Sequence, residues 1–102
     1  MLIMTPLQKT ILEVLEPDFR YEQTDWIPSF RLMPRLLGKA GKEIIRKGID
    51  ADDVAQMLQE LQSKGLVEYS PLYRESIFQG FTTRLTARGY NMLHYGRPSL
   101  VG

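Results

Sequence analysis

Cysteine is absent from the 102-residue sequence, and histidine occurs once. Without cysteine there is no disulfide, no thiolate nucleophile and no cysteine-type zinc site, and one histidine leaves too few nitrogen ligands for most other metal sites. No apolar run approaches the roughly 18 to 20 residues that a membrane-spanning helix requires. We therefore expect a fold that depends on its hydrophobic core, with no metal, no cofactor and no membrane span.

Catalytic motifs are missing as well. The sequence has no glycine-rich phosphate loop, no HExxH motif and no nucleophile elbow, and the single His94 is a poor candidate for a base that activates a serine. The first residues, MLIMTPLQKT, lack the basic segment, the long apolar segment and the cleavage site of a secretory signal. The sequence thus predicts no enzyme and no catalytic residue, and it indicates a cytoplasmic protein.

The residues that are present are typical of one small globular domain. Hydrophobic residues make up 43% of the chain and charged residues 25%, which is close to the average for soluble globular chains. A chain of this length is also close to the commonest domain size. We predict a single domain over residues 1–102, with flexible ends at residues 1–4 and 97–102.

The net charge of +1 conceals blocks of opposite sign along the chain. Residues 1–30 carry a net charge of −3, residues 31–47 of +5, residues 50–68 of −4 and residues 69–102 of +3. Separated patches of this kind can attract a partner with one face and repel it with another.

Helix signals are clearest near the start and in the middle of the chain. Thr5 is a suitable N-cap with Gln8 at the capping-box position, and the helix that follows is expected to end before Pro17. A second helix begins after Asp50, where Asp53 occupies the third helical position and favours the positive end of the helix dipole. Apolar residues then recur at helical spacing: Val54, Met57, Leu58 and Leu61.

Residues 17–40 are harder to interpret, because Pro28 and Pro34 argue against one uninterrupted helix. A short helix over residues 29–37 would place Phe30, Met33 and Leu37 on one side. The aromatic residues that precede it, Phe19, Tyr21 and Trp26, either cover the edge of the core or offer a stacking surface to a ligand.

The next segment, GKEIIRKGI, predicts a helix of two turns. Ile44 and Ile45 would face inward, and Gly48 would end the helix in a left-handed conformation that glycine adopts readily.

Alternating residues over 66–70 and 77–85 predict two antiparallel strands. The segment PLYRES between them predicts a mobile loop, so that the hairpin would have a long tip. On the second strand one face would carry Ile77, Gln79, Phe81, Thr83 and Leu85. Thr86 is then a suitable N-cap for a closing helix over ARGYNMLHYG.

This order of elements resembles the winged helix-turn-helix superfamily, especially small prokaryotic or phage transcriptional regulators of the MarR-like and PadR-like kind. The matching letters are GID at the turn, VAQMLQELQSKGLVEYS through the following helix and strand, and FTTRLTARGYNML through the second strand and last helix. They fall within residues 43–93, about half of the chain. The resemblance implies an α+β, mainly helical fold with a three-helix core, a two-stranded β-hairpin wing and a closing C-terminal helix.

The resemblance also implies a regulator that binds double-stranded DNA, acting as a homodimer on a palindromic site. Helix 50–64 would read the major groove, with Gln56 and Gln59 suited to adenine edges. The basic segment 39–47, with Arg31 and Arg35 upstream, and the wing 71–80 would contact the DNA backbone. The candidate DNA-binding residues are Lys39, Lys42, Arg46, Lys47, Asp52, Ala55, Gln56, Gln59, Tyr73 and Arg74.

A second function stays open because helix 50–64 begins with three aspartates, which a phosphate backbone repels. Asp50 and Asp53 have a role in capping the helix, which leaves only Asp52 unexplained. Since one fold often hosts several functions, the chain is alternatively a protein-interaction module: an adaptor, antirepressor or inhibitor. Its acidic helix would then bind a basic protein partner, and the lysines of segment 39–47 would only solvate a helix face.

Overall fold

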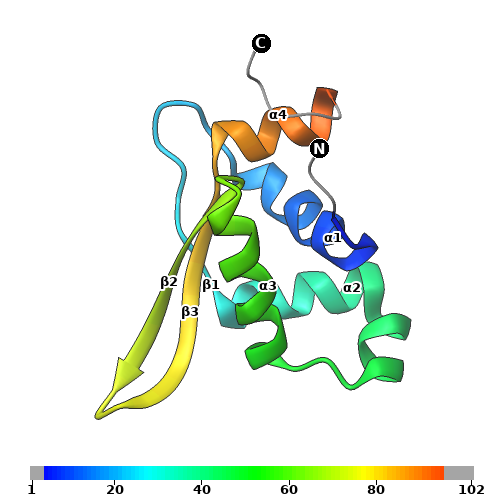
Figure 1. The fold of residues 1–102 in the computed structure, drawn as a ribbon, viewed down its shortest axis with the longest axis vertical. Coiled ribbons are helices and arrows are strands. Elements are labelled where there is room, and N and C mark those ends of the chain that lie inside the picture. Colours follow the sequence, from blue (N-terminus) through cyan, green and yellow to red (C-terminus); the bar gives the residue numbers. More distant parts are fainter. Residues whose placement is uncertain (1–3, 96–102) are drawn as a thin grey trace.

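The computed structural model describes residues 4–95 and consists of helices and one three-stranded antiparallel sheet (Figure 1). The elements are α1 (Pro6–Leu15), the 3-10 helix η1 (Glu16–Asp18), β1 (Ile27–Pro28), α2 (Ser29–Lys47), α3 (Ala51–Ser63), β2 (Val67–Arg74), β3 (Ile77–Leu85) and α4 (Ala87–Tyr95). The fold is α+β and mainly helical, as the sequence predicts. Of the predicted flexible ends, residues 1–3 and 97–102 lie outside the described residues, and Met4 packs half-buried against the core.

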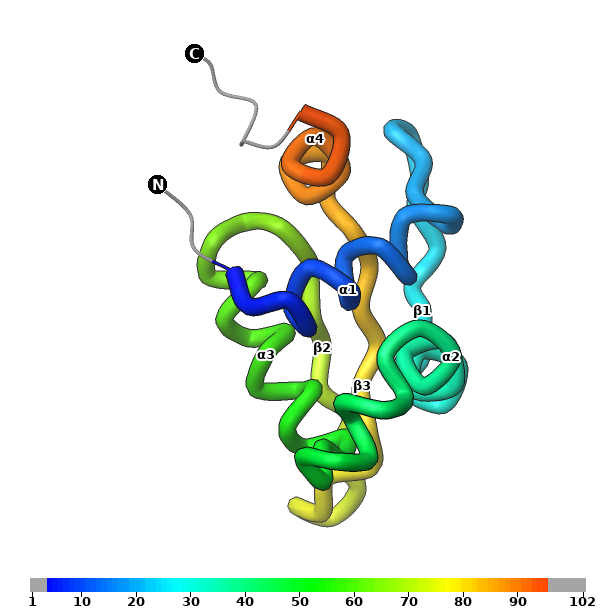
Figure 2. The backbone as a smooth tube through the Cα atoms, turned by 90° about the vertical axis from the view of Figure 1, so that its right-hand side faces the viewer, coloured from blue at the N-terminus to red at the C-terminus, as the bar shows by residue number. Residues whose placement is uncertain are grey.

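The sheet has the strand order β1-β3-β2, so β3 is central. Strands β2 and β3 form a hairpin, and the two-residue β1 pairs antiparallel with β3 on its other side. Figure 1 shows α3 and the first part of α2 on the same side of this sheet, and Figure 2 shows them to the left and right of one another. The far half of the hairpin extends beyond both helices.

The hydrophobic core lies between the helices and the near half of the hairpin. Its largest fully buried side chains are Phe81, Ile11, Leu12, Leu15, Ile27, Leu32, Leu36, Leu58, Leu61, Leu66, Leu85 and Val54. Burying a side chain of this kind contributes about 1.5–3 kcal/mol. Most of these side chains come from α1, α2, α3 and β3, so packing among these four elements stabilises the fold.

The predicted helix caps are confirmed. Thr5 and Gln8 form a capping box, in which each side chain accepts the other residue's backbone N–H. Gly48 ends α2 with φ of 65°. The Thr86 hydroxyl accepts the N–H of Gly89 at 3.0 Å at the start of α4. These contacts involve residues three apart, which is why the sequence alone indicates them.

Helix α2 consists of two helical segments joined at a kink, as the sequence predicts from a short helix over residues 29–37 and a second one over GKEIIRKGI. It runs from Ser29 to Lys47 with a kink at Ala40, where φ is −133° and ψ is 31°. Pro34 lies inside the helix and removes one backbone donor without ending it. The break therefore falls between the two glycines of the GKAG segment, and not at either proline.

The exposed side of α2 is also not the one that the sequence predicts. Phe30 and Leu37 are 76% and 45% exposed, whereas Leu32 and Leu36 are fully buried. Ile44 is buried as predicted, but Ile45 is 75% exposed. Apolar residues occur all around this helix, so periodicity does not decide which side faces the core.

The three early aromatic residues cover the edge of the core. Phe19 is 7% exposed and stacks on Tyr90 of α4 at 4.6 Å between ring centroids. Tyr21 meets the edge of the Phe19 ring at 4.9 Å. Trp26 lies beneath the guanidinium of Arg84 at 4.5 Å. All of these rings have partners inside the chain.

The hairpin has no long loop at its end, so the prediction of a mobile tip is wrong. Strand β2 continues to Arg74, which pairs with Ile77. Only Glu75 and Ser76 form the turn, with φ of 51° and 69°. Positive φ at both central residues is the geometry of a type I′ turn, whose twist matches that of the strands.

A β-bulge at Gln79 changes the alternation of β3. Leu72 pairs with Gly80, but the next residue, Tyr73, pairs with Phe78, which leaves Gln79 as an extra residue. Gly80 has φ of 121°, and a Cβ added there would lie 2.5 Å from the Ser29 hydroxyl. Glycine is therefore required next to the bulge.

The bulge also decides which face each tip residue occupies. Because directly paired residues share a face of the sheet, Phe78 joins Tyr73 on the face that carries the buried Phe81 nearer the core. Ile77 joins Arg74 on the opposite face. The prediction that Ile77 and Phe81 share one face is wrong.

Candidate nucleic-acid interface

Helix α3 presents a polar arc to solvent. Its exposed residues are Asp52, Gln56, Gln59, Glu60, Gln62 and Ser63. Asp52, Gln56 and Gln59 are spaced by four and seven residues, so they lie close together on one side of the helix. The arc carries two carboxylates and no cation.

Ala55 does not belong to this arc. It is 5% exposed, so the solvent exposure predicted for it is wrong. Ala55 lies toward the hairpin, on the side where the Gln62 Oε1 accepts the backbone N–H of Tyr69 at 2.6 Å. Packing between α3 and β2 covers that side of the helix, and the sequence pattern does not reveal this contact.

Two of the three aspartates at the start of α3 are engaged in its cap. The Asp50 carboxylate accepts the N–H of Asp53 at 3.0 Å, and the Asp53 carboxylate accepts the N–H of Asp50 at 3.0 Å. The backbone N–H of Asp53 holds the pKa of Asp50 below its ordinary value. Within residues 4–95, the exposed Asp52 side chain makes no hydrogen bond or ion pair.

The cap predicts how acid affects stability. The pKa of Asp50 is lower in the folded chain than in the unfolded chain, so the charge of its carboxylate stabilises the fold. This stabilisation is fully present above the ordinary aspartate pKa. It is lost as the pH falls through the lowered pKa of the folded chain. Asparagine caps helices about as well as aspartate. We expect the wild type to melt above Asp50→Asn near neutral pH, and the difference to vanish in acid. Thermal melts between about pH 6 and about pH 2 measure this.

Asp25→Asn is the matched control, because Asp25 is exposed and makes no side-chain hydrogen bond within the described residues. This variant should follow the wild type across the pH range. A difference between wild type and Asp50→Asn that stays constant with pH would contradict the assigned role of the charge.

The predicted cations of α2 are all exposed on its second half: Lys39, Lys42, Arg46 and Lys47. Lys47 lies 3.8 Å from the Glu43 carboxylate, an exposed pair that holds it weakly. Upstream, Arg35 is not available in the same way, because it pairs with Asp18 and also donates to the Val14 carbonyl. Lys42, Arg46 and Lys47 therefore place exposed positive charge after the kink, beside the turn that leads into α3, while Arg31 and Lys39 are exposed before it.

The end of the hairpin carries Tyr73 and Arg74, both predicted and both exposed. Tyr73 is 64% exposed and meets the Phe78 ring at 5.8 Å. Arg74 has no ion pair within the part of the chain that the structure describes. The apolar character of the tip was not predicted from the sequence, although Leu72 and Ile77 in PLYRESIF indicate it.

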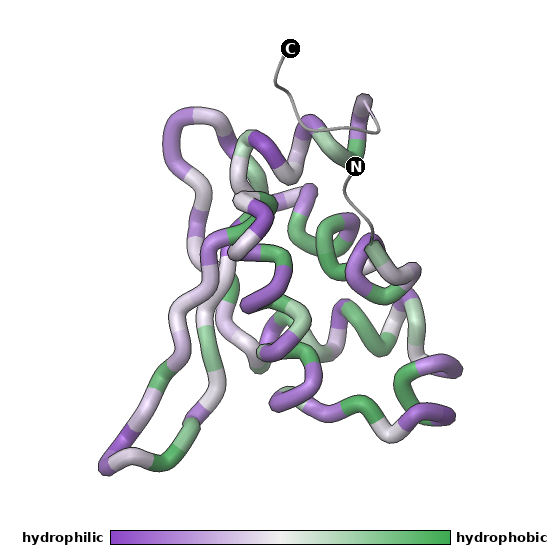
Figure 3. The backbone as a smooth tube through the Cα atoms, in the orientation of Figure 1, coloured by the Kyte–Doolittle hydropathy of each residue, from purple (hydrophilic) through white to green (hydrophobic). Residues whose placement is uncertain are grey.

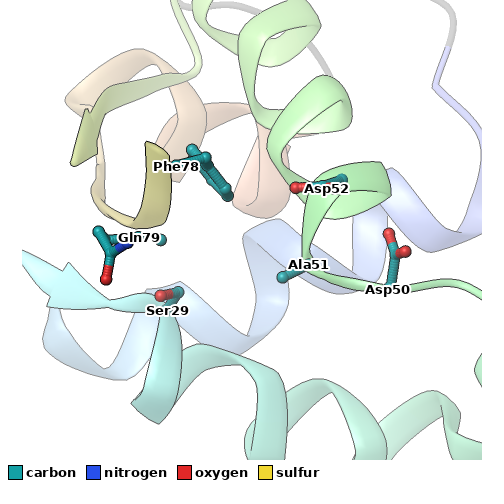
Figure 4. Close-up of a pocket in the computed structure, with 7 residues that line it drawn as sticks. Ser29, Asp50, Ala51, Asp52, Phe78 and Gln79 are labelled. Atoms are coloured by element: carbon teal, nitrogen blue, oxygen red, sulfur yellow. The ribbon is translucent and has the colours of Figure 1, made fainter. Parts of the chain in front are cut away.

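A groove separates the start of α3 from the hairpin (Figure 4). It is lined by Ser29, Asp50, Ala51, Asp52, Phe78, Gln79 and Gly80. In Figure 4 the side chains of Asp52 and Phe78 point toward each other from its two walls. The fold thus brings one free carboxylate and one aromatic ring together.

The basic end of α2, the start of α3 and the hairpin tip all lie at the lower end of the molecule in Figures 1 and 2. The elements that carry the predicted site residues therefore reach one end of the fold, although Ala55 is buried there. No family model, curated protein or solved structure matched this chain.

The outer edge of β2 is closed to an additional strand over much of its length. Gln62 occupies the outward N–H of Tyr69. Two residues later, Pro71 pairs with Phe81, whose own N–H points away from β2 to the Ser29 hydroxyl. The nitrogen of Pro71 therefore faces the outer edge and has no hydrogen to donate. These features disfavour a partner that binds by strand addition.

Among residues 4–95, no three histidine, aspartate or glutamate side chains gather in a way that could hold a metal ion. None of the helices in that range combines the length and the hydropathy needed to cross a bilayer.

Proposed function

We propose that the chain is a winged helix-turn-helix protein that binds double-stranded DNA and regulates transcription. The element order α1-β1-α2-α3-β2-β3 and the sheet order β1-β3-β2 support this assignment. The observation that carries the proposal is the placement of unpaired cations at the end of α2 and at the hairpin tip, with the start of α3 at the same end of the molecule.

Each part has a distinct role in this proposal. Lys42 and Arg46 neutralise phosphates beside the turn, and Arg74 does so from the hairpin. Gln56, on the outward arc of α3, offers a donor and an acceptor that match an adenine edge, and Gln59 does the same one turn on. The positioning contacts are therefore cationic and the reading contacts are neutral.

The carboxylates of α3 oppose this binding only weakly. A carboxylate about 8 Å from a phosphate in water costs about 0.5 kcal/mol before salt screening, so Asp52 and Glu60 together cost about 1 kcal/mol. Glu60 is already engaged, since its carboxylate accepts a hydrogen bond from the Gln8 amide at 2.9 Å. One phosphate contact contributes about as much as the two carboxylates remove.

Salt-dependent binding tests the proposal. Three phosphate contacts predict a slope of about −2.7 in a plot of log affinity against log salt, hence a roughly 40-fold loss between about 50 and about 200 mM salt. Fluorescence anisotropy with labelled duplexes measures it. Absence of binding at the lower salt, or a slope near zero, would exclude DNA binding. Selection from a random duplex pool then reveals symmetry, since an enriched palindrome indicates a dimer.

A second candidate function is supported by the outward arc of α3, which has two carboxylates and no cation. In this alternative the arc binds a basic protein. A stoichiometric partner recovered from nuclease-treated extract of the source cell, and lost with Asp52→Lys, would favour it. Recovery that Asp52→Lys leaves unchanged would remove its basis.

A further inference from the structure

The end of the hairpin is apolar and exposed. Leu72, Tyr73 and Ile77 are 44%, 64% and 62% exposed, on a ribbon that projects away from the helices (Figure 1). Figure 3 shows hydrophobic residues on both strands of this ribbon near its end. Apolar side chains gathered on a projecting element are typical of a surface that another molecule covers.

The two faces of the tip differ. On one face the rings of Tyr73 and Phe78 meet edge to face, so each ring has a partner. On the other face lie Leu72, Arg74 and Ile77, and no ring contact or ion pair within residues 4–95 engages them. The second face is therefore the one that is free to bind.

The shape of the tip is fixed before any partner arrives. The turn has only two residues, Glu75 and Ser76, and the bulge at Gln79 is held where Gly80 meets Ser29. The Ser29 hydroxyl also accepts the N–H of Phe81 at 3.3 Å. A hairpin held in this way loses little conformational entropy when it inserts a side chain into a binding partner.

We propose that the hairpin inserts Ile77, with Leu72 beside it, between two base pairs from the minor groove, which unstacks that step and bends the duplex. This inference rests on the proposed DNA binding. Apolar wedges of this kind kink DNA by about 20–90°. Arg74 lies on the same face and binds a flanking phosphate, and the carboxylate of the neighbouring Glu75 offsets part of its charge.

The size and charge of the tip favour DNA over a protein as the occupant. The two apolar side chains on the free face, Leu72 and Ile77, are 44% and 62% exposed. Two such side chains offer far less area than the roughly 800 Å² per partner of a stable protein interface. A base step needs only one or two such side chains, with a cation beside them. Arg74 supplies that cation and has no ion pair in the described chain.

The test measures binding and bending in one titration. Anisotropy reports binding, end-to-end fluorescence energy transfer reports bending, and 2-aminopurine placed at successive steps reports unstacking. We expect the wild type to bend the duplex and to raise 2-aminopurine fluorescence at one step. Ile77→Ser should bind within about 10-fold of the wild type, since phosphate contacts carry most of the affinity, and should leave the duplex straight.

Leu37→Ser is the matched control, because Leu37 is also aliphatic, is 45% exposed and lies on α2 outside the basic segment 39–47. It should bend DNA as the wild type does. Binding without bending or unstacking by the wild type, or unchanged bending by Ile77→Ser, overturns the wedge and leaves the proposed function standing. Ile77-dependent binding to anionic vesicles or to a protein, without bending of DNA, also overturns it. Failure of the wild type to bind any duplex at low salt removes the proposed function itself.

Discussion

Replacing Gly89 with alanine is expected to destabilise the fold strongly. A Cβ at this position would lie 2.1 Å from the carbonyl oxygen of Leu66 and 2.7 Å from a methyl carbon of Leu85. The same carbonyl accepts the N–H of Thr86 at 3.2 Å, so it cannot move without weakening that bond. Overpacking and the disturbed hydrogen bond together cost about 2–4 kcal/mol. A melting temperature lower by roughly 10–25 °C, measured by circular dichroism, is the expected result.

Gly38→Ala is the control for this experiment. It adds the same methyl group to α2, where a Cβ would have no neighbour within 4 Å. Alanine exceeds glycine in helix propensity by about 1 kcal/mol, so Gly38→Ala should stabilise the chain by about that amount. Equal melting temperatures for Gly89→Ala and Gly38→Ala would contradict the close contact between Gly89 of α4 and the Leu66 carbonyl.

Removing Lys42 and Arg46 together is expected to give the largest loss of DNA affinity among the pairs of cations described. Both are exposed on α2, and alanine preserves the helix. Each phosphate contact contributes about 0.9 units to the salt slope, so the double variant should lose about two units. At about 0.1 M salt this corresponds to roughly 50-fold weaker binding. Anisotropy titrations at several salt concentrations measure both quantities.

The loss should be similar for every duplex, because phosphate contacts carry no sequence information. Lys9 and Arg88 provide a control with the same change in net charge. Both are exposed, on α1 and α4 in the upper half of the molecule in Figure 1. Replacing these two with alanine should change the affinity by less than about 3-fold, since charges beyond a Debye length are screened. Equal losses from the two double variants would show that net charge, and not the end of α2, controls binding.

Patterns of residues close together in the chain predicted where helices begin and end. They did not predict which side of α2 is exposed. The capping boxes at Thr5 and Asp50 depend on residues three apart in the chain, and both occur as predicted. The exposed Phe30 and the buried Leu32 are equally apolar, and only the packing of α2 against α1 and the sheet separates them. A helix that is apolar on several sides carries no periodic signal for the one that is buried.

The candidate site likewise has some features that the sequence predicted and others that depend on tertiary contacts. The sequence identified the cations of α2 and the glutamines of α3, because charge and helical spacing are properties of the chain itself. It did not reveal that Ala55 is covered by the hairpin, or that Arg74 and Ile77 share a face. Those facts depend on a side-chain contact between α3 and β2, and on one extra residue at Gln79.

The sequence by itself determined the charge blocks, the helix caps, the long periodic helix α3 and the pairing of two strands after it. The tertiary structure decided which side of α2 is buried and how the hairpin ends. The difference has a physical cause: caps and periodicity depend on residues within one or two turns. The side of α2 that is buried and the face that Ile77 occupies depend on contacts across the fold, such as that of Gly80 with Ser29.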